Sequence, residues 1–306
     1  MMKMYDLAIV GGGPAGLSAA LYAGRAGLSC VVLEKLFFGG QMLKTSEIDN
    51  YPGAPEIRDV FSFSESMRAQ AAEFGAEFKT EEVVEVRENN GIKTIVTTNG
   101  EYRAKALILA TGAFPKKLGV PGEEEFAAKG VSYCATCDGA FFRNKTATVV
   151  GGGDTALEDA LFLSAICKTV YVVHRRDTFR GAKHLYNRAK NKENIRFVLN
   201  STVSEIVGEN TVTGVKVKNV KDETETLIDT NAVFIAIGST PDSGVFKGFV
   251  KLDKYGYVIT DKNLQSSVSG VFAAGDVRQK TLRQIITAAA DGAESVYNVQ
   301  KFIFEH

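Results

Sequence analysis

The sequence is poor in several residues that mark common classes of protein. It has no tryptophan, 3 histidines, 6 prolines and 4 cysteines among 306 residues. Four cysteines in a chain of this length do not form the disulfide framework that small secreted domains carry. The three histidines show no ligand spacing with any cysteine pair, so we expect no metal site.

Charge of one sign and long apolar runs are missing as well. The 36 basic residues balance 36 acidic residues and form no run of one sign, so there is no footprint for nucleic acid or an anionic membrane surface. No apolar run approaches the length of a membrane span. The first apolar run ends at the glycines 11–13, which makes it too short for a signal peptide. We expect a cytoplasmic, two-domain globular protein with no nucleic-acid or membrane partner.

Two of the few cysteines form a motif. Cys134 and Cys137 are three residues apart, and Asp138 follows directly. Such a pair can close into a disulfide, exchange with another disulfide through its thiolate, and pass protons to a nearby carboxyl group. Half of a zinc site is the alternative, but no second C-x-x-C exists, and Cys30 and Cys167 stand alone in apolar runs. Asp138 has a second possible role, as a helix N-cap.

A first glycine turn lies near the N-terminus. The apolar run 7–10 ends on Gly11, Gly12, Gly13, Pro14, Ala15 and Gly16. A segment with a helical apolar face follows, Gly27 ends it, and the next apolar run, 29–33, ends on Glu34. In a dinucleotide-binding unit the glycines allow a tight turn, close approach of a pyrophosphate and close helix–strand packing, while the acid binds a ribose hydroxyl. This unit is predicted to bind FAD or NAD, the alternative being a glycine-rich loop without a ligand.

A second copy of the turn follows the cysteine motif. The apolar run 147–150 ends on Gly151, Gly152, Gly153, Asp154, Thr155 and Ala156. His174 holds the position relative to this turn that Glu34 holds relative to the first, and three arginines follow it: Arg175, Arg176 and Arg180. Guanidinium groups bind a 2′-phosphate that an acid would repel, so this unit is predicted to bind NADP. The alternatives are a solvated basic turn for the arginines and simple packing for His174.

The order of the elements predicts one domain inserted into another. Strand-like runs at 82–86 and 93–98 flank a turn, and the run 106–110 leads into Thr111 and Gly112. The runs 199–218 and 232–236 close the inner domain, and 270–274 leads to Gly275 and Asp276. A long helix is expected after that, with its apolar face at Leu282, Ile285, Ile286, Ala289 and Val296. The expected fold is α/β, with two Rossmann-like three-layer nucleotide-binding domains. The expected boundaries are 1–113 and 243–306 for the outer domain and 114–242 for the inner one.

With these motifs in place, the chain resembles the low-molecular-weight thioredoxin reductases over essentially its whole length. The motifs that carry the resemblance are Gly11–Gly16, Gly39–Gln41, Asn50–Gly53, Ala110–Gly112, Cys134–Gly139, Gly151–Ala156, His174–Arg176 with Arg180, and Gly270–Asp276 with Arg283 and Gln284.

The resemblance implies an enzyme that passes electrons from NADPH through FAD and the dithiol to thioredoxin. It implies that Cys137 lies near the flavin, that Cys134 attacks thioredoxin and that Asp138 carries the proton. It also implies a homodimer. Expected FAD contacts are Gly11, Gly13, Pro14, Ala15, Gly16, Glu34, Gly40, Gln41, Asn50, Thr111, Gly112, Gly275, Asp276, Arg283, Gln284 and Ile285. Expected NADPH contacts are Gly151, Gly153, Asp154, Thr155, Ala156, His174, Arg175, Arg176 and Arg180.

Three related groups and one other class are the alternatives. Ferredoxin-dependent members of the family have lost the dinucleotide signature and its arginines, and flavin-dependent ferredoxin–NADP reductases lack the C-x-x-C. Dithiol oxidases acting on a small metabolite lack the arginines. A flavin-containing redox sensor without turnover is the alternative outside enzymes, and the intact Cys134, Cys137 and Asp138 count against it.

The order of motifs also predicts motion. The dithiol and the second glycine turn belong to one domain, and the flavin is expected in the other. Dithiol and nicotinamide cannot occupy the same flavin face at once, since each needs near-contact distance. We therefore expect two alternating domain arrangements, with the short crossings at 114–117 and 238–242 as hinges.

Overall fold

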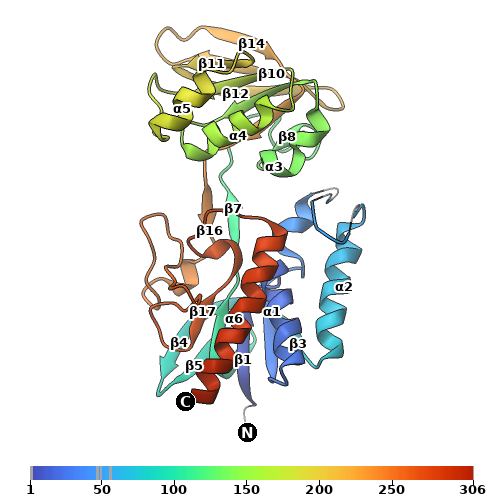
Figure 1. Cartoon of the computed structure of the whole chain (residues 1–306), viewed down its shortest axis with the longest axis vertical. Helices are drawn as coiled ribbons and strands as arrows, with labels where there is room; N and C mark the ends of the chain where they lie inside the picture. Colours follow the sequence, from blue (N-terminus) through green and yellow to red (C-terminus); the bar gives the residue numbers. More distant parts are fainter. Residues whose placement is uncertain (1–2, 46–47, 49, 55–56, 306) are drawn as a thin grey trace. The chain divides into compact units, whose positions relative to one another are not determined.

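The structure, a computed structural model, describes residues 3–45, 48, 50–54 and 57–305. The chain divides into two units (Figure 1). The first unit holds residues 1–114 and 240–306, and the second holds residues 115–239. Each unit has its own sheet and its own hydrophobic core.

A mixed sheet, seven-stranded within the described residues, forms the centre of the first unit, in the order β3-β2-β1-β6-β5-β4, with β17 paired to the end of β6. Strands β1, β2, β3, β6 and β17 are parallel, and the β4–β5–β6 meander is antiparallel. Their bounds are Met4–Val10 (β1), Cys30–Glu34 (β2), Glu77–Thr80 (β3), Val83–Asn89 (β4), Ile92–Thr97 (β5), Gly100–Leu109 (β6) and Val271–Ala273 (β17).

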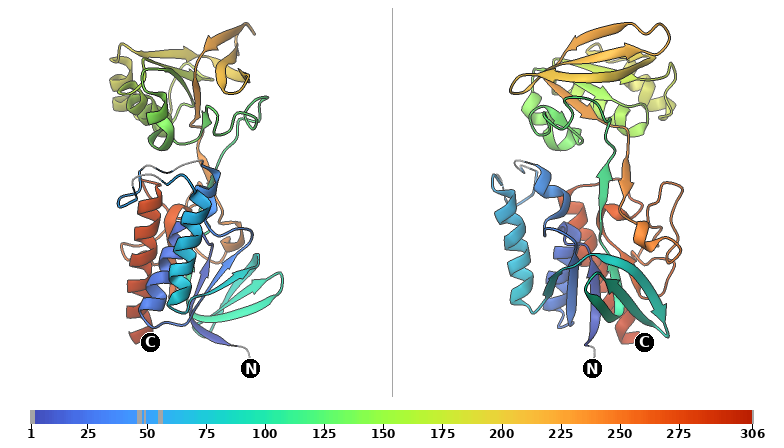
Figure 2. Two further views of the ribbon diagram at one scale, coloured as in Figure 1. Left: turned by 90° about the vertical axis from the view of Figure 1, so that its right-hand side faces the viewer. Right: turned by 180° about the vertical axis from the view of Figure 1, so that it is seen from behind.

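Both faces of this sheet are covered, which explains the continuous apolar runs of β1, β2 and β6. Leu7 and Ile9 of β1 belong to the hydrophobic cluster on the face of the sheet that helices cover, the helical side. Ala8 and Val10 belong to the cluster on the opposite face. Helices α1 (Pro14–Arg25), α2 (Val60–Glu73) and α6 (Ile285–Glu305) lie on the helical side (Figure 1). The meander and the segment around the short 3₁₀ helix η3 (Gly244–Phe246) cover the other side (Figure 2). Two more 3₁₀ helices belong to this unit, η1 (Gly40–Lys44) and η4 (Gly275–Val277).

The buried face of α6 differs from the one expected. Leu282 precedes the helix and is 52% exposed, and Ile286 is 40% exposed. The face that is buried consists of Ala288, Asp291, Gly292, Ser295, Val296 and Val299. Small residues are needed there because α6 lies directly against α1: a Cβ on Gly292 would be 2.2 Å from the carbonyl oxygen of Ala15. Of the predicted residues, Val296 is buried and Ile285 is partly buried. The apolar pattern missed the rest of the buried face because two of its members are polar and one is glycine.

The second unit is built on a parallel sheet that is five-stranded over the described residues, in the order β11-β10-β9-β15-β8. The bounds are Val131–Ser132 (β8), Thr146–Val150 (β9), Thr169–His174 (β10), Ile195–Leu199 (β11) and Ala232–Ile235 (β15). Helices cover one face: α3 (Ala135–Asp138), α4 (Asp154–Ser164) and α5 (Lys183–Lys190), with η2 (Gly139–Phe142). An antiparallel sheet covers the other: β12 (Ser201–Gly208), β13 (Val212–Asn219) and β14 (Glu225–Asp229).

The chain passes between the units twice, in two short strands that pair with each other (Figure 2). These are β7 (Ala113–Pro115) and β16 (Ser239–Pro241). The amide of Lys116 donates to the carbonyl of Gly238 at 3.0 Å, and the amide of Asp242 donates to that of Gly112 at 3.0 Å. The expected fold class, α/β with two Rossmann-like nucleotide-binding domains, is confirmed.

Candidate active site

The first glycine turn joins β1 to α1, and its three glycines have different surroundings. Gly11 has a φ of +108°, and a Cβ there would be 2.3 Å from the carbonyl oxygen of Ala110. A Cβ on Gly16 would be 1.9 Å from the carbonyl oxygen of Gly11. Gly13, which precedes the first helical residue Pro14, would place a Cβ no closer than 3.9 Å to any neighbour. Two glycines are thus needed for the turn itself, and the middle one leaves open space at the helix N-terminus, where a phosphate is favoured.

Glu34 lies beside this turn, at the end of β2. Its Oε2 accepts a hydrogen bond from the amide of Gly12 at 2.8 Å, and its Oε1 accepts one from the amide of Leu36 at 3.0 Å. These bonds fix the carboxylate and leave lone pairs on both oxygens. The chain therefore holds an oriented acceptor next to the open end of α1, as binding of a ribose hydroxyl requires.

The loops after β2, after β6 and before α6 contain the other residues of the first unit that were predicted to contact FAD. Gly40 lies against the first turn, because a Cβ on it would be 3.1 Å from the Cα of Gly13. Gln41 follows on η1 and is half-buried. Asn50 donates from Nδ2 to Oε1 of Gln284 at 3.1 Å. Thr111 and Gly112 follow the end of β6. The Thr111 hydroxyl donates to the carbonyl of Asp242 at 2.5 Å, and Gly112 has a φ of +76°.

Two polar atoms near the start of α6 are buried without a hydrogen-bond partner in the described part of the chain. They are Oδ1 of Asp276, on η4, and Nε of Arg283. The Arg283 guanidinium carbon lies 4.4 Å from the ring centroid of Tyr257. Burial raises the pKa of Asp276, against the nearby cations Lys280 and Arg283, which lower it. Unpaired buried groups are costly, and hydroxyl and carbonyl groups of a bound flavin nucleotide would satisfy them. The residues present therefore fit FAD.

The second glycine turn joins β9 to α4 and repeats the geometry of the first. A Cβ on Gly151 would be 2.3 Å from the carbonyl oxygen of Ala236 and 2.7 Å from the Cβ of Ala156. Gly153, directly before Asp154 and Thr155 of α4, would place a Cβ more than 4 Å from any neighbour. This turn, too, is close-packed at its first glycine and open at its middle one.

The residues after β10 are fixed to this turn. His174 is 5% exposed. Its ring stacks on Phe179 with 4.9 Å between centroids, and its Nε2 lies 3.1 Å from the carbonyl oxygen of Thr178. Burial lowers the pKa of His174. A Cβ on Gly152 would be 2.0 Å from the ring, so the histidine packs directly beneath the turn. This is the packing role that the sequence left open.

The three arginines predicted to bind the 2′-phosphate, Arg175, Arg176 and Arg180, are exposed. The amide of Arg180 donates to the carbonyl of Gly152 at 2.8 Å, which holds its backbone beside the glycine turn. Arg175 and Arg176 follow His174 directly at the carboxyl end of β10. No ion pair joins any of these three guanidinium groups to a residue that the structure describes. The groups are therefore available to an external anion.

The dithiol lies in the second unit at the N-terminus of α3. Cys134 and Cys137 form a disulfide. Ser132 of β8 donates from Oγ to Oδ2 of Asp138 at 2.5 Å and accepts from the amide of Cys134 at 3.1 Å. The N-cap residue of α3 is Cys134, and Asp138 holds the N-cap position of the 3₁₀ helix η2 without a capping hydrogen bond from its side chain. The proton-transfer role of Asp138 stays a prediction. Ser132 was missed by sequence reasoning, because a serine six residues before an aspartate carries no pattern of its own.

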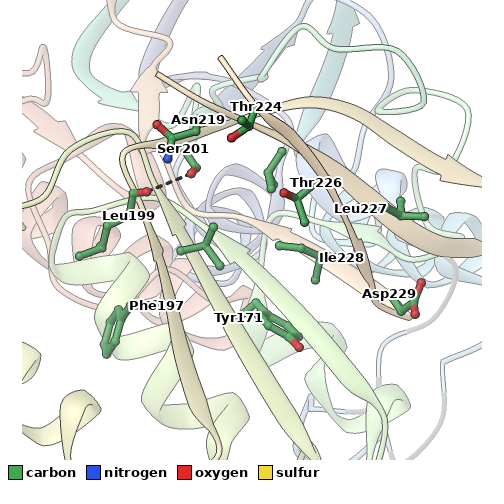
Figure 3. Close-up of a pocket in the computed structure, with 12 residues that line it drawn as sticks. Tyr171, Phe197, Leu199, Ser201, Asn219, Thr224, Thr226, Leu227, Ile228 and Asp229 are labelled. Carbon is green, nitrogen blue, oxygen red and sulfur yellow. Dashed lines mark hydrogen bonds between the residues drawn. The ribbon is translucent and has the colours of Figure 1, made fainter. Parts of the chain in front are cut away.

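One pocket of the second unit does not coincide with these residues. A pocket of about 550 Å³ lies between β10–β11 and the β12–β14 sheet, lined by side chains such as Tyr171, Asn219 and Thr226, and contains none of the predicted site residues (Figure 3). Among the described residues, no group of three or more His, Cys, Asp and Glu side chains could hold a metal ion. No helix within the described ranges has the length and hydropathy to cross a membrane.

Known proteins share this arrangement. The sequence profile described as pyridine nucleotide-disulphide oxidoreductase matches residues 5–292. A thioredoxin reductase from Peptoclostridium acidaminophilum is 46% identical over 309 residues, covering 99% of this chain and 98% of the relative. A bifunctional thioredoxin reductase/thioredoxin from Mycobacterium leprae is 43% identical, covering 99% of this chain and 67% of the relative. The crystal structure of a thioredoxin reductase from Streptococcus pyogenes MGAS5005 has 43% identity and a TM-score of 0.93, covering 99% of each chain.

The chain therefore belongs to the pyridine nucleotide-disulphide oxidoreductase family. Its branch of that family is the thioredoxin reductases, as the resemblance predicted. The predicted enzyme class is confirmed, and membership implies the two predicted cofactors, FAD and NADPH. The assignment of individual residues to those cofactors stays a prediction.

Proposed function

We propose that this enzyme reduces oxidised thioredoxin with electrons from NADPH, through FAD held by the first unit and the dithiol of the second. The observation that carries the proposal is the Cys134–Cys137 disulfide, with a hydrogen-bonded Asp138 beside it, in the same unit as an open glycine turn followed by three unpaired arginines. FAD, when bound, supplies hydride acceptance from NADPH and two-electron transfer to a disulfide.

The two glycine turns differ in the charge at their outer ends, and this supports the assignment of cofactors. At the first, Glu34 is oriented to accept a ribose hydroxyl and would repel a 2′-phosphate. At the second, Arg175, Arg176 and Arg180 offer planar donors that match a phosphate in bidentate fashion. We assign FAD to the first turn and NADPH to the second.

Thiol–disulfide exchange accounts for the last step. After reduction of the internal disulfide, the Cys134 thiolate attacks the disulfide of thioredoxin, and one thioredoxin sulfur leaves as a thiolate that takes up a proton. The Cys137 thiolate then attacks the Cys134 sulfur, which re-forms the internal disulfide and releases reduced thioredoxin. We assign Asp138 to the proton transfers, because it is adjacent to the pair and is held by Ser132.

We also propose that the two units change their relative orientation during each cycle. The dithiol belongs to one unit and the predicted FAD residues to the other. The connections β7 and β16 are short, contain Pro115 and Pro241, and have Gly238 directly before β16. A covalent cross-link that locks one arrangement should stop one half-reaction and spare the other. A locked enzyme that cycles at the normal rate would rule out the motion.

The homodimer and the cytoplasmic location are further proposals. The homodimer is the norm of the family that the chain resembles, and light scattering of the purified protein tests it. A reducing compartment agrees with the two buried cysteines outside the motif, Cys30 and Cys167, which are both free thiols.

A purified-protein assay tests the proposed function. The FAD-loaded enzyme is given NADPH or NADH, and oxidised thioredoxin, an artificial disulfide or a small-molecule dithiol. We expect NADPH-dependent reduction of thioredoxin. Oxygen-dependent oxidation of the small dithiol without use of NADPH would favour a dithiol oxidase, and binding without any turnover would favour a sensor.

A further inference from the structure

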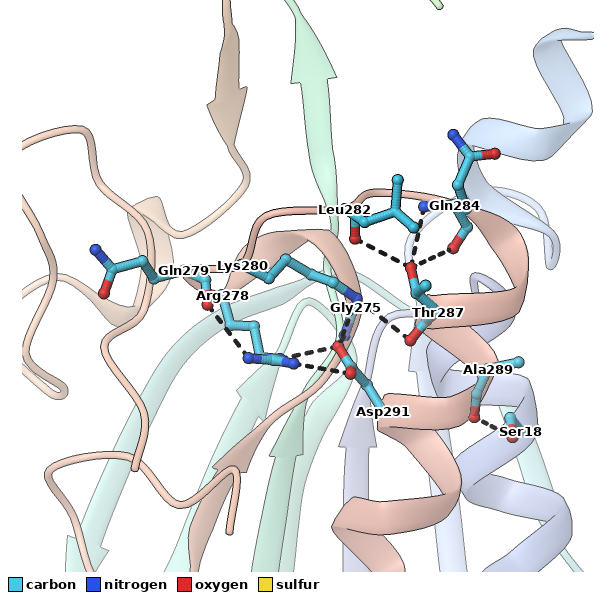
Figure 4. A network of polar contacts seen from close by, with 10 residues as sticks. All are labelled: Ser18, Gly275, Arg278, Gln279, Lys280, Leu282, Gln284, Thr287, Ala289 and Asp291. Carbon is cyan, nitrogen blue, oxygen red and sulfur yellow. Dashed lines mark hydrogen bonds and ion pairs between the residues drawn. The ribbon is translucent and has the colours of Figure 1, made fainter. Parts of the chain in front are cut away.

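The first unit buries a carboxylate that is not among the predicted cofactor contacts. Asp291 lies on the buried face of α6 and is 6% exposed. Its Oδ2 accepts hydrogen bonds from the amide of Gly275 at 2.9 Å, from Nε of Arg278 at 2.8 Å and from Nζ of Lys280 at 2.8 Å. Its Oδ1 accepts from Nη2 of Arg278 at 2.9 Å (Figure 4).

The cations in this network are buried with the carboxylate. The Lys280 and Arg278 side chains are 7% and 17% exposed. Burial opposes ionisation of Asp291, but the hydrogen bonds from Arg278 and Lys280 outweigh it, and the pKa of the carboxyl lies below its usual value. Removing one partner of such a buried network leaves an uncompensated charge and is costly.

Hydrogen bonds and close packing hold the loop between β17 and α6 in place at several points. Gly275, at its start, has a φ of +74°, and a Cβ there would be 2.9 Å from the Cβ of Ala15 in α1. Lys280, in the middle, also donates to the carbonyl of Thr287 at 3.2 Å. At its end, the Thr287 hydroxyl oxygen accepts from the amide of Gln284 at 3.1 Å (Figure 4). Asp291 therefore ties this loop to α6 directly opposite the first glycine turn.

Asp276 follows Gly275 directly and has its buried Oδ1 unpaired within the described residues. Lys280 and Arg278 cannot be counted as its hydrogen-bond partners, because every contact of theirs described here goes to Asp291 or to backbone carbonyls. Because Arg278 and Lys280 are hydrogen-bonded to Asp291, Oδ1 of Asp276 stays free for another donor.

We propose that Asp291 is a positioning residue of the FAD site: it holds the Gly275–Lys280 loop against α6 and occupies the two loop cations, so that Asp276 is kept available for a hydroxyl group of FAD. This inference rests on the proposed function, because it takes FAD as the ligand of the first unit. Asp291 itself touches no cofactor and acts through Asp276.

The test measures FAD release from the holoenzyme. Asp291→Asn keeps the shape of the side chain but removes the charge that pairs the two cations. We expect release of FAD, followed by the fluorescence of free flavin, to become at least tenfold faster, while the far-UV circular dichroism of the holoenzyme stays that of the wild type. Asp276→Asn should accelerate release as well, and the double variant should be no faster than the quicker single variant, because both act on one contact.

Asp6→Asn is the matched control. Asp6 is also in the first unit and also holds a cation and a chain segment, with Oδ1 accepting from Lys105 at 2.7 Å and Oδ2 from the Ser29 hydroxyl at 2.7 Å. It should leave FAD release unchanged. Equal acceleration by both asparagine variants, additive effects of Asp291→Asn and Asp276→Asn, or a wild-type release rate in Asp291→Asn would each overturn the proposal.

Arg278→Lys covers the case in which Asp291→Asn does not fold. It keeps the charge and loses the two-pronged contact, so FAD release should accelerate by about threefold to tenfold. A wild-type rate in that variant contradicts the proposal. The readout is separate from thioredoxin reduction: wild-type enzyme that retains FAD but does not reduce thioredoxin would refute the proposed function and leave this test in force.

Discussion

The Ser132 hydroxyl lies 2.5 Å from a carboxylate oxygen of Asp138 and accepts a hydrogen bond from the amide of Cys134 at 3.1 Å. A single side chain from β8 thus fixes both the acid of the motif and the backbone of its first cysteine. The hydrogen bond from Ser132 therefore orients the Asp138 side chain beside the disulfide.

This relationship predicts unequal effects of two substitutions. Asp138→Asn keeps the hydrogen bond to Ser132 but removes the acid, and it should slow thioredoxin reduction by roughly 10²-fold or more. Ser132→Ala keeps the acid but frees it, and should cost about tenfold. The measurement is the pH–rate profile of thioredoxin reduction, which should flatten in Asp138→Asn and persist in Ser132→Ala. Identical profiles for wild type and Asp138→Asn would remove the carboxyl from proton transfer.

Coenzyme preference should depend on Arg175, Arg176 and Arg180. Replacing all three with glutamine removes charge-assisted bonds to the 2′-phosphate, each worth about 1.5–3 kcal/mol, so the preference for NADPH over NADH should fall at least tenfold. Arg196→Gln is the control, since this exposed arginine of β11 lies over the Tyr171 ring instead. The measurement is kcat/KM with NADPH and with NADH for the wild type and both variants. A triple variant with an unchanged preference contradicts the assignment.

The middle glycines of the two turns offer a matched pair of substitutions. A Cβ on Gly13 would be 3.9 Å from the nearest atom, an ordinary van der Waals contact, and a Cβ on Gly153 would have no atom within 4 Å. Both alanine variants should therefore fold with little loss of stability, yet the added methyl group lies where a phosphate must approach. Gly13→Ala should release FAD faster, with an unchanged KM for NADPH. Gly153→Ala should raise the KM for NADPH and leave the rate of FAD release unchanged. The two cofactors would be assigned to the wrong turns if these effects were exchanged.

The burial of Lys93 predicts that the free energy of unfolding depends on pH. It is 1% exposed, and burial lowers its pKa below the usual 10.5, against the charge of Glu88. The unfolded chain therefore binds this proton more tightly, and the free energy of unfolding should rise with pH between the lowered pKa and 10.5. Lys93→Met removes this contribution. Urea unfolding of both proteins at pH 7 and 9.5 measures it, and the gain on going to high pH should be smaller in the variant; equal gains would show that the lysine titrates normally.

Some features of the fold and site were predictable from local sequence, and others were not. The glycine turns were, because each depends on residues a few positions apart and on the strand and helix that flank them. The buried face of α6 was not, because close packing against α1 selects Gly292 and Ser295 over larger apolar residues and the network selects Asp291. The contact of Ser132 with Asp138 joins β8 to α3 over only six residues, but a serine at that spacing belongs to no recognised motif. The inward-packed ring of His174 depends on Gly152 and Phe179 together.

The central claim is that electrons from NADPH reach thioredoxin only through Cys134 and Cys137. Its most direct test is an anaerobic titration of Cys134→Ser, Cys137→Ser and wild-type holoenzyme with NADPH, followed by addition of oxidised thioredoxin. The wild type should take up twice the reducing equivalents per FAD of either variant, because it reduces a disulfide as well as the flavin, and it alone should reduce thioredoxin. Both variants should still bind FAD and accept electrons from NADPH. If either serine variant reduces thioredoxin at the wild-type rate, the disulfide is not on the path of the electrons.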